Sequence, residues 1–338
     1  MRSTRTDVAK LAGVSTATVS YVLNNTRNIT EATKNKVLSA VAELNYKPDM
    51  VARSMGKNET KQISIVLDNI TNPFYGEIVL GFENAAMEKG YFVNICTGYK
   101  DLDKYFENFI TRRIDGVFIV AIPYKFLMDE VYKLIDYGIK IVMSANVEAD
   151  IKMVSSIEND YVEAMDVVVT YLYQLEHRNI AYLSGLSRNL KFDRKAEGYL
   201  KAVKRYELPC GDKLLFDGNA PYTTDIGDGY NLAQKLIASG QKFTAVICLN
   251  DLMAIGAIKA LKEKGYKIPE DVSVVGFDDI AYAASFSPSI TTMGIDKAWF
   301  GAKAFELLYA NITRGNTGFF MNKLQLIERE STSICRKD

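Results

Sequence analysis

The first sixty residues combine a helical spacing of apolar positions with one short polar break. Small or apolar residues recur three or four positions apart on both sides of this break, at Val8, Ala9, Leu11, Val19, Val22 and Leu23. Gly13 stands where a tight turn needs a positive φ angle, and Ser15 can cap the second helix. The outward positions of that second helix are Thr16, Ala17, Ser20 and Tyr21. This spacing predicts a helix-turn-helix that reads DNA.

A third helix is expected to close a small helical bundle. Thr30 can cap it, and apolar residues spaced by three and four continue through residues 37–44. Pro48 ends this pattern, a short helical pattern covers 49–55, and the polar stretch 56–61 has the composition of a linker.

From residue 63 onward, short apolar strands alternate with amphipathic helices. Strands are expected at 63–68, 91–97, 116–121, 140–144, 180–184, 213–216, 245–249 and 272–277, and helices at 74–89, 102–113, 126–137, 162–175, 192–205, 229–238 and 252–264. Continuous apolar strands between helices predict parallel sheets covered on both faces. Two doubly wound α/β lobes of similar build are therefore expected, with a small-ligand cleft between them.

Composition and charge agree with this division. The 338 residues have a net charge of zero. Residues 1–60 nevertheless hold nine Lys or Arg against five Asp or Glu, which gives +4 and leaves −4 for the rest. The N-terminus has no apolar leader, and no stretch approaches the roughly 18 apolar residues of a membrane span. A soluble, cytoplasmic protein is expected.

The sequence contains no motif that indicates an enzyme or a metal site. The four cysteines form no C-x-x-C pair, and the single His177 has no metal-ligand partner at a useful spacing. His177 is expected to be an ordinary turn or helix-end residue. Dinucleotide-binding, P-loop and nucleophile-elbow motifs are absent from the sequence, so no cofactor, no metal and no enzyme activity are expected. A transport-binding protein is disfavoured by the missing leader and by the DNA-reading module.

The chain resembles the lactose repressor (LacI/GalR) family of bacterial regulators along its whole length. The resemblance is carried by Asp7-Val8-Ala9, Ala12-Gly13-Val14-Ser15, Thr18-Val19-Ser20, Val22-Leu23-Asn24, Tyr46, Pro48, Ala52-Arg53-Ser54, Asn72-Pro73-Phe74-Tyr75, Asn250-Asp251, Met253-Ala254, Gly256, Ser273 to Asp279 and Thr291-Thr292. It implies a homodimer that places two helix-turn-helix units on a pseudo-palindromic double-stranded DNA operator. A tetramer is not expected, because the C-terminus lacks a leucine heptad.

The resemblance also implies a domain plan in which the chain crosses between the lobes three times. The expected segments are a helix-turn-helix domain at 1–47, a hinge helix and linker at 48–60, and an effector-binding and dimerisation domain at 61–338, with an N-lobe of about 61–158 and 288–320 and a C-lobe of about 159–287 and 321–338.

Candidate DNA contacts fall into three groups. Thr16 and Ala17, with Tyr21 one turn later, are expected to face base edges in the major groove. Phosphate contacts or ordinary caps are expected of Ser15, Thr18, Ser20, Asn24 and Thr33. By resemblance, Met55 is the minor-groove wedge, Ala52 packs beside it and Arg53 reaches phosphates.

The resemblance places an effector site in the cleft. Asp278 is expected to accept hydrogen bonds from the effector, and Asn250 to offer a donor and an acceptor. Phe74 and Tyr75 are expected to stack on a ring, although Phe74 can equally be core and Asp278 a cap. The family's clamping arginine falls at Lys195 here, with Arg194 one residue earlier. Both stay open, with Arg194 preferred.

These features predict a ligand-responsive repressor of a carbohydrate-uptake or catabolism operon. A sugar or sugar derivative in the cleft would change operator affinity, in a direction that the sequence does not fix. The alternative is control by a protein co-repressor.

Overall fold

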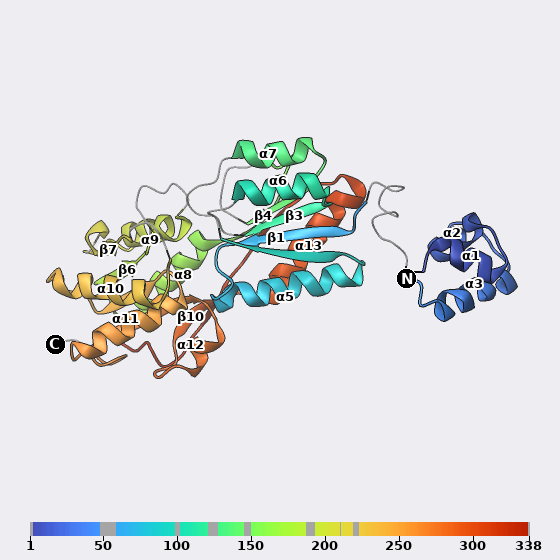
Figure 1. Ribbon diagram of the computed structural model, residues 1–338. Coiled ribbons are helices and arrows are strands. Elements are labelled where there is room, and N and C mark those ends of the chain that lie inside the picture. Colours follow the sequence, from blue (N-terminus) through green and yellow to red (C-terminus); the bar gives the residue numbers. More distant parts are fainter. Residues whose placement is uncertain are drawn as a thin grey trace. The chain divides into compact units, whose positions relative to one another are not determined.

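The computed structural model describes residues 3–47, 59–98, 102–120, 128–144, 150–186, 193–209, 211–218 and 223–336 (Figure 1). They belong to two compact units, Met1–Thr60 and Lys61–Asp338. The first unit is helical, whereas the second contains two mainly parallel sheets with helices. The expected fold class is therefore confirmed. The hinge segment expected at 49–55 lies outside the described residues.

The first unit, the expected DNA-binding unit, forms three short helices within its described residues. They are α1 (Arg5–Ala12), α2 (Thr16–Asn24) and α3 (Glu31–Glu43). A capping box between Thr4 and Asp7 begins α1, and Gly13 ends it in the left-handed region at a φ of 68°. The Ser15 hydroxyl accepts the Thr18 N–H at 3.1 Å and so begins α2. The local signals in the sequence therefore fix both edges of the turn.

The core of this unit is smaller than the apolar pattern predicted. Its buried residues are Val8, Ala9, Ala12, Val19, Val37, Ala40 and Tyr46. Leu11 and Leu38 belong to the apolar pattern but are 46 % and 45 % exposed, whereas the smaller Ala12 and Ala40 on the same helices are buried. Thr30 precedes α3, yet its side chain caps no backbone N–H and contacts the Thr33 hydroxyl instead.

The second unit, the expected sensor unit, contains two sheets. The first has six strands in the order β11-β5-β4-β3-β1-β2, with parallel pairing throughout. Its elements are β1 (Gln62–Leu67), α5 (Pro73–Glu88), β2 (Phe92–Thr97), α6 (Leu102–Arg112), β3 (Gly116–Val120), α7 (Met128–Asp136), β4 (Lys140–Ser144), β5 (Ser155–Asn159), α13 (Lys297–Arg314) and β11 (Phe319–Asn322).

Alternate side chains of these strands enter two separate cores. Ile65 and Phe118 pack on the face covered by α5 and α13, whereas Val66 and Ile119 pack on the face covered by α6 and α7 (Figure 1). This period of two buries both faces of a parallel sheet, which explains why its strands are continuously apolar.

The second sheet repeats this architecture in the order β12-β10-β9-β8-β6-β7. Its elements are α8 (Tyr161–Gln174), β6 (Ile180–Leu183), α9 (Arg194–Arg205), a 3-10 turn (Gly211–Leu214), β7 (Leu215–Phe216), α10 (Ile226–Ala238), β8 (Ala245–Cys248), α11 (Asp251–Glu263), β9 (Ser273–Asp278), α12 (Ala281–Ser285), β10 (Thr291–Gly294) and β12 (Gln325–Ile327). Only the β10–β12 pair, among the described strands, is antiparallel.

Sheet membership shows where the chain passes between the lobes. It passes between β5 and α8, between β10 and α13, and between β11 and β12. The expected N-lobe segment beginning at residue 288 needs correction, because Thr291–Gly294 pairs with β9 in the second sheet. The same strand also pairs with β12, so this stretch belongs to the C-lobe up to residue 294.

Each lobe contains a pair of helices that touch backbone to backbone through reciprocal glycines. A Cβ at Gly81 of α5 would lie 1.9 Å from the Ala298 carbonyl oxygen of α13, and one at Gly301 would lie 2.0 Å from that of Ile78. In the C-lobe, Gly229 of α10 and Gly256 of α11 make the same kind of crossing. Only glycine permits such an approach.

Candidate functional site

Helix α2 presents a small, polar first turn to solvent. Thr16 and Ala17 are exposed, as a helix that reads the major groove requires. The Ser15 and Thr18 hydroxyls contact each other at 2.9 Å, and the Asn24 amide donates to the Ser20 hydroxyl at 3.2 Å. These polar groups are therefore oriented by one another and stay within reach of solvent.

An arginine that the sequence analysis missed lies beside this surface. The Arg27 guanidinium stacks over the half-buried Tyr21 ring, with its central carbon 4.6 Å from the ring centroid. It follows α2 by only three residues, so its position after the helix was the available signal. The wedge residues Ala52, Arg53 and Met55 lie outside the described residues.

In the sensor unit, Lys195 points inward from α9. Its ammonium group donates to the Leu249 carbonyl oxygen at 2.7 Å. The same group lies 4.5 Å from the centroid of the Tyr161 ring and 4.4 Å from that of Phe277. A buried cation is thus held between two aromatic faces at the ends of secondary-structure elements.

Arg194 does not share this environment, which corrects the preference for it. Its side chain is 47 % exposed and forms an ion pair with Glu197 at 2.7 Å. Helical periodicity explains the difference, because Lys195 lies on the same side of α9 as the buried Gly198 and Tyr199.

Asp278 ends β9 in a strained backbone conformation. Its φ is 101° and that of Asp279 is 50°. Both values lie in the left-handed region, which residues other than glycine rarely adopt. Asp251 supports this loop, since its carboxyl group accepts the Ile280 N–H at 2.9 Å and the Thr292 hydroxyl at 2.7 Å. Such strain persists only where neighbouring contacts over-determine it, and it is frequent at binding sites.

Burial sets the electrostatics of this cluster. It lowers the pKa of Lys195, an effect that the Asp278 carboxylate opposes. Burial likewise raises the pKa of Asp278, and the ammonium groups of Lys195 and Lys297 oppose that rise. Asp193, which caps α9 and accepts the Ser184 hydroxyl at 2.6 Å, also has its pKa raised by burial. The cluster therefore combines two ammonium groups with several carboxyl groups out of water.

Asn250 already uses both ends of its amide within the protein. Its oxygen accepts the Met253 N–H at 2.8 Å and caps α11, while its nitrogen donates to the Thr224 carbonyl at 2.9 Å. The structure thus gives Asn250 a positioning role for this loop and leaves one lone pair of its oxygen for a ligand.

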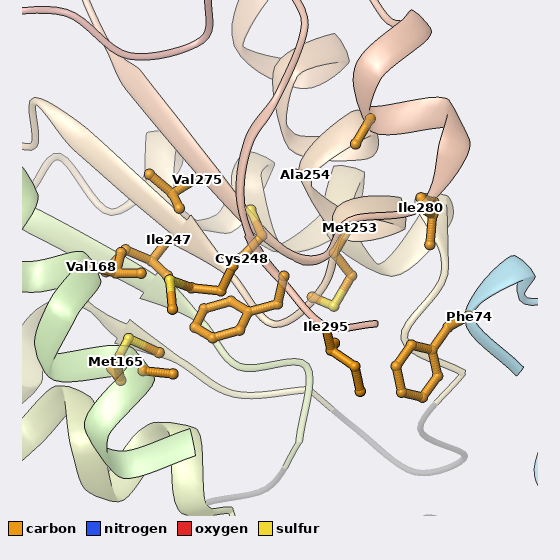
Figure 2. Packing of buried hydrophobic residues seen from close by; sticks show 14 of the residues in the cluster. Phe74, Met165, Val168, Ile247, Cys248, Met253, Ala254, Val275, Ile280 and Ile295 are labelled. Carbon is orange, nitrogen blue, oxygen red and sulfur yellow. The ribbon is translucent and has the colours of Figure 1, made fainter. Parts of the chain in front are cut away.

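The aromatic residues at the start of α5 are buried. Phe74 and Tyr75 are 8 % and 9 % exposed, with ring centroids 5.2 Å apart in an edge-to-face arrangement. Figure 2 shows the Phe74 ring pointing toward Ile295, within a cluster that also contains Met253 of the C-lobe. Phe74 therefore packs where the two lobes meet, as its alternative core assignment anticipated.

His177 is a buried structural residue. Its ring nitrogens lie 2.9 Å from the Thr244 hydroxyl and 3.0 Å from the Ser273 hydroxyl, and one of them also lies 3.1 Å from the Ser333 carbonyl oxygen. Among the described residues, no group of His, Cys, Asp and Glu is placed to hold a metal ion. Within the same residues, no helix is long and apolar enough to cross a membrane.

A helix-turn-helix in the same chain as a two-lobed α/β unit with a buried cluster of charged side chains defines a class, the ligand-controlled transcription regulators. Comparison with protein families then identifies the chain more narrowly. Residues 4–49 match the bacterial regulatory proteins of the lacI family, and residues 60–325 match the periplasmic binding proteins and sugar binding domain of LacI family. The chain belongs to the LacI family and is a DNA-binding transcriptional repressor of that family.

Individual relatives agree with this assignment. The chain is 34 % identical to the HTH-type transcriptional repressor PurR of Mannheimia succiniciproducens, over 98 % of this chain and 97 % of the relative. It is 36 % identical to a protein of the same name from Vibrio cholerae, over 98 % of both.

Solved structures show the same fold. A lac repressor dimer bound to operator and the anti-inducer ONPF has a TM-score of 0.85 at 24 % identity, over 98 % of this chain and all of that one. A complex of the transcriptional regulator CelR with cellobiose has a TM-score of 0.73 at 25 % identity, over the same shares.

Proposed function

We propose that this repressor binds a small, uncharged effector at Lys195 and Asp278, and that this binding sets its affinity for a pseudo-palindromic operator. The observation that carries the proposal is the buried Lys195 ammonium. Among the described residues, the Leu249 carbonyl is the hydrogen-bond acceptor that this group reaches. Two of its three N–H groups therefore remain for the oxygen of a bound molecule.

Charge argues against a phosphorylated effector. The Asp278 carboxyl group is buried beside Lys195, while Lys297 uses its ammonium group on protein oxygens. A phosphate would add negative charge to this site and leave its desolvation uncompensated. An uncharged ring that carries hydroxyl or N–H donors for Asp278 suits the site better.

The chemical identity of the ring is open between two classes. The sequence predicted a sugar and a carbohydrate operon, and the CelR neighbour is described with cellobiose. The relatives compared above are instead named PurR and carry no sugar in their names. Sugars and nucleobases both offer a donor to Asp278, an acceptor to Lys195 and a face for an aromatic ring, so the experiment must include both.

The test is a thermal-shift screen of the full chain with ribose, glucose, cellobiose, adenine and guanine, and with glucose 6-phosphate and AMP as charged counterparts. A bound compound raises the melting temperature by linkage. We expect a response to an uncharged compound, and loss of that response in Lys195→Met but not in Arg194→Met. The two variants remove the same charge from adjacent residues, one buried and one exposed.

Two results would overturn the effector proposal. One is a larger shift with a charged counterpart than with its uncharged parent, and the other is a full response in Lys195→Met. If no compound of the panel raises the melting temperature, this result would also count against the effector proposal and would favour a protein co-repressor. Operator sites selected from random double-stranded DNA would then report whether the active compound weakens or strengthens DNA binding, which gives the sign of control.

The proposed repressor acts as a homodimer through its sensor unit. Large apolar side chains are exposed along α5 and the edge strand β2, namely Leu80, Met87, Phe92 and Ile95, at 54 %, 65 %, 67 % and 48 %. Exposed apolar side chains on an edge strand and on the helix beside it support association with a second copy. Analytical ultracentrifugation should give twice the chain mass, and Leu80→Glu should shift the equilibrium toward monomer.

A further inference from the structure

A second buried lysine lies where the C-lobe passes into the N-lobe. Lys297 is the first residue of α13, and its side chain is only 4 % exposed. Its ammonium group donates to the carbonyl oxygens of Asp278 at 2.9 Å and of Asp279 at 2.8 Å. The same nitrogen lies 3.5 Å from a carboxylate oxygen of Glu77 on α5. Three acceptors thus match the three donors of one ammonium group.

On the C-lobe side, these contacts hold the strained turn after β9. The carbonyl groups that Lys297 binds belong to the two residues with left-handed backbone, Asp278 and Asp279. The side chain of Asp279 is held from another direction by an ion pair with Arg329. A change in the position of Asp278 therefore moves a carbonyl that is bonded directly to Lys297.

On the N-lobe side, Lys297 belongs to a rigid pair of helices. Helix α13 crosses α5 at Gly81 and Gly301, where the two backbones touch. Glu77, the other partner of Lys297, lies on α5 one turn after Phe74. Because packed helices in backbone contact do not slide freely, a displacement of Lys297 is passed to α5.

We propose that Lys297 is the positioning residue through which the state of Asp278 is passed to the N-lobe. The proposal rests on the function proposed above, in that Asp278 is the group that meets the effector. It assigns Lys297 no contact with the effector, because its donors are already used by the protein. Loss of its ammonium group should leave effector binding in place and remove the response of the N-lobe.

The chain contains its own reporter for this response. Trp299 is the single tryptophan of the sequence, lies two residues after Lys297, and packs edge-to-face on Phe320 with ring centroids 5.4 Å apart. It is 40 % exposed, so its emission and its quenching by acrylamide respond to movement at the start of α13.

The first experiment needs no effector. Asp278→Asn alters the effector-facing carboxylate, and Trp299 emission of the full chain is compared with and without this change in three backgrounds: wild type, Lys297→Met and Lys323→Met. Lys323→Met is the matched control, because it removes an exposed ion pair to Glu163 at 3.0 Å near another crossing between the lobes. We expect Asp278→Asn to change the emission in the wild type and in Lys323→Met but not in Lys297→Met. An equal change in all three backgrounds would refute the proposal.

The second experiment adds the compounds of the thermal-shift panel. Any compound that binds should change Trp299 emission in the wild type, and should still raise the melting temperature of Lys297→Met but without that emission change. A purely structural role would instead lower affinity and stability together. If no compound binds, the effector proposal fails while the Asp278→Asn comparison still decides the role of Lys297.

A variant on the exposed side of the contact covers the case in which Lys297→Met does not fold. Glu77→Gln removes the charged N-lobe partner, which is 49 % exposed, and leaves the buried contacts of Lys297 intact. We expect it to reduce the emission change caused by Asp278→Asn. An undiminished change in Glu77→Gln would contradict the proposed path.

Discussion

The carboxyl group of Asp251 should make the sensor unit less stable as the pH rises through neutrality. This side chain is fully buried, and burial together with the nearby Asp278 raises its pKa from 3.8 to about 8. Between these two values the folded protein retains a proton that the unfolded chain releases. The free energy of unfolding therefore falls as the pH increases across this window.

The magnitude follows from proton linkage. Each pH unit in which the two states differ by one proton changes the free energy of unfolding by about 1.4 kcal/mol. From pH 6 to pH 8 the folded carboxyl group becomes half ionised, so the integrated loss is about 2 kcal/mol. Burial also raises the pKa values of Asp193 and Asp278, so these groups act in the same direction. Burial lowers the pKa of His177, and this residue therefore increases the free energy of unfolding as the pH rises through the usual range of a histidine.

Comparison with Asp251→Asn isolates the contribution of this one group. Urea unfolding of the wild type and the variant at pH 6, 7 and 8, followed by Trp299 fluorescence, reports the sensor unit alone because Trp299 belongs to that unit. The variant should gain about 2 kcal/mol relative to the wild type between pH 6 and pH 8. Parallel pH profiles would mean that Asp251 is ionised in the folded state, supported by the Ile280 N–H and the Thr292 hydroxyl.

Two further predictions address the packing of α5 and the hinge. Gly81→Ala should destabilise the sensor unit by about 3 kcal/mol, because its Cβ would lie 1.9 Å from the Ala298 oxygen. The control Gly76→Ala lies on the same helix, and its Cβ would meet no atom within 4 Å. It should therefore stabilise the unit by about 0.5–1 kcal/mol. Calorimetric melting of both variants checks this, and equal effects would contradict the close crossing. Met55→Gly should sharply weaken binding to a selected operator and leave effector affinity unchanged, and equal operator affinity would remove the wedge hypothesis.

The sequence predicted the elements whose signals are local. The helix-turn-helix is determined by Gly13 and by the Ser15 cap, which need no distant partner. Most strands of the two sheets are continuous apolar runs, so their burial is visible in the residues themselves. Strand β5 was missed for the opposite reason, because Ser155, Ser156 and Glu158 are polar and are buried only through pairing with β4 and β11.

The candidate site was only partly visible in the sequence. Helical periodicity could have decided between Arg194 and Lys195, since Lys195 and Tyr199 are four residues apart and share the buried side of α9. The left-handed turn at Asp278 and its contact with Lys297 could not be predicted, because they depend on a crossing between lobes that no local pattern encodes. Asn250 was interpreted as a ligand group, although its position before α11 is equally that of a helix cap.

The late strands of this fold also have a consequence for the order in which the protein folds. Strand β11 pairs with β5 across more than 150 residues, and β12 then adds to β10, so residues 319–327 complete the edges of both sheets. The DNA-binding unit is a compact unit within the first sixty residues, so it can fold early in synthesis, whereas neither sheet of the sensor can be finished until its last strands have been translated. During synthesis, the part that reads DNA is therefore ready well before the part that regulates it.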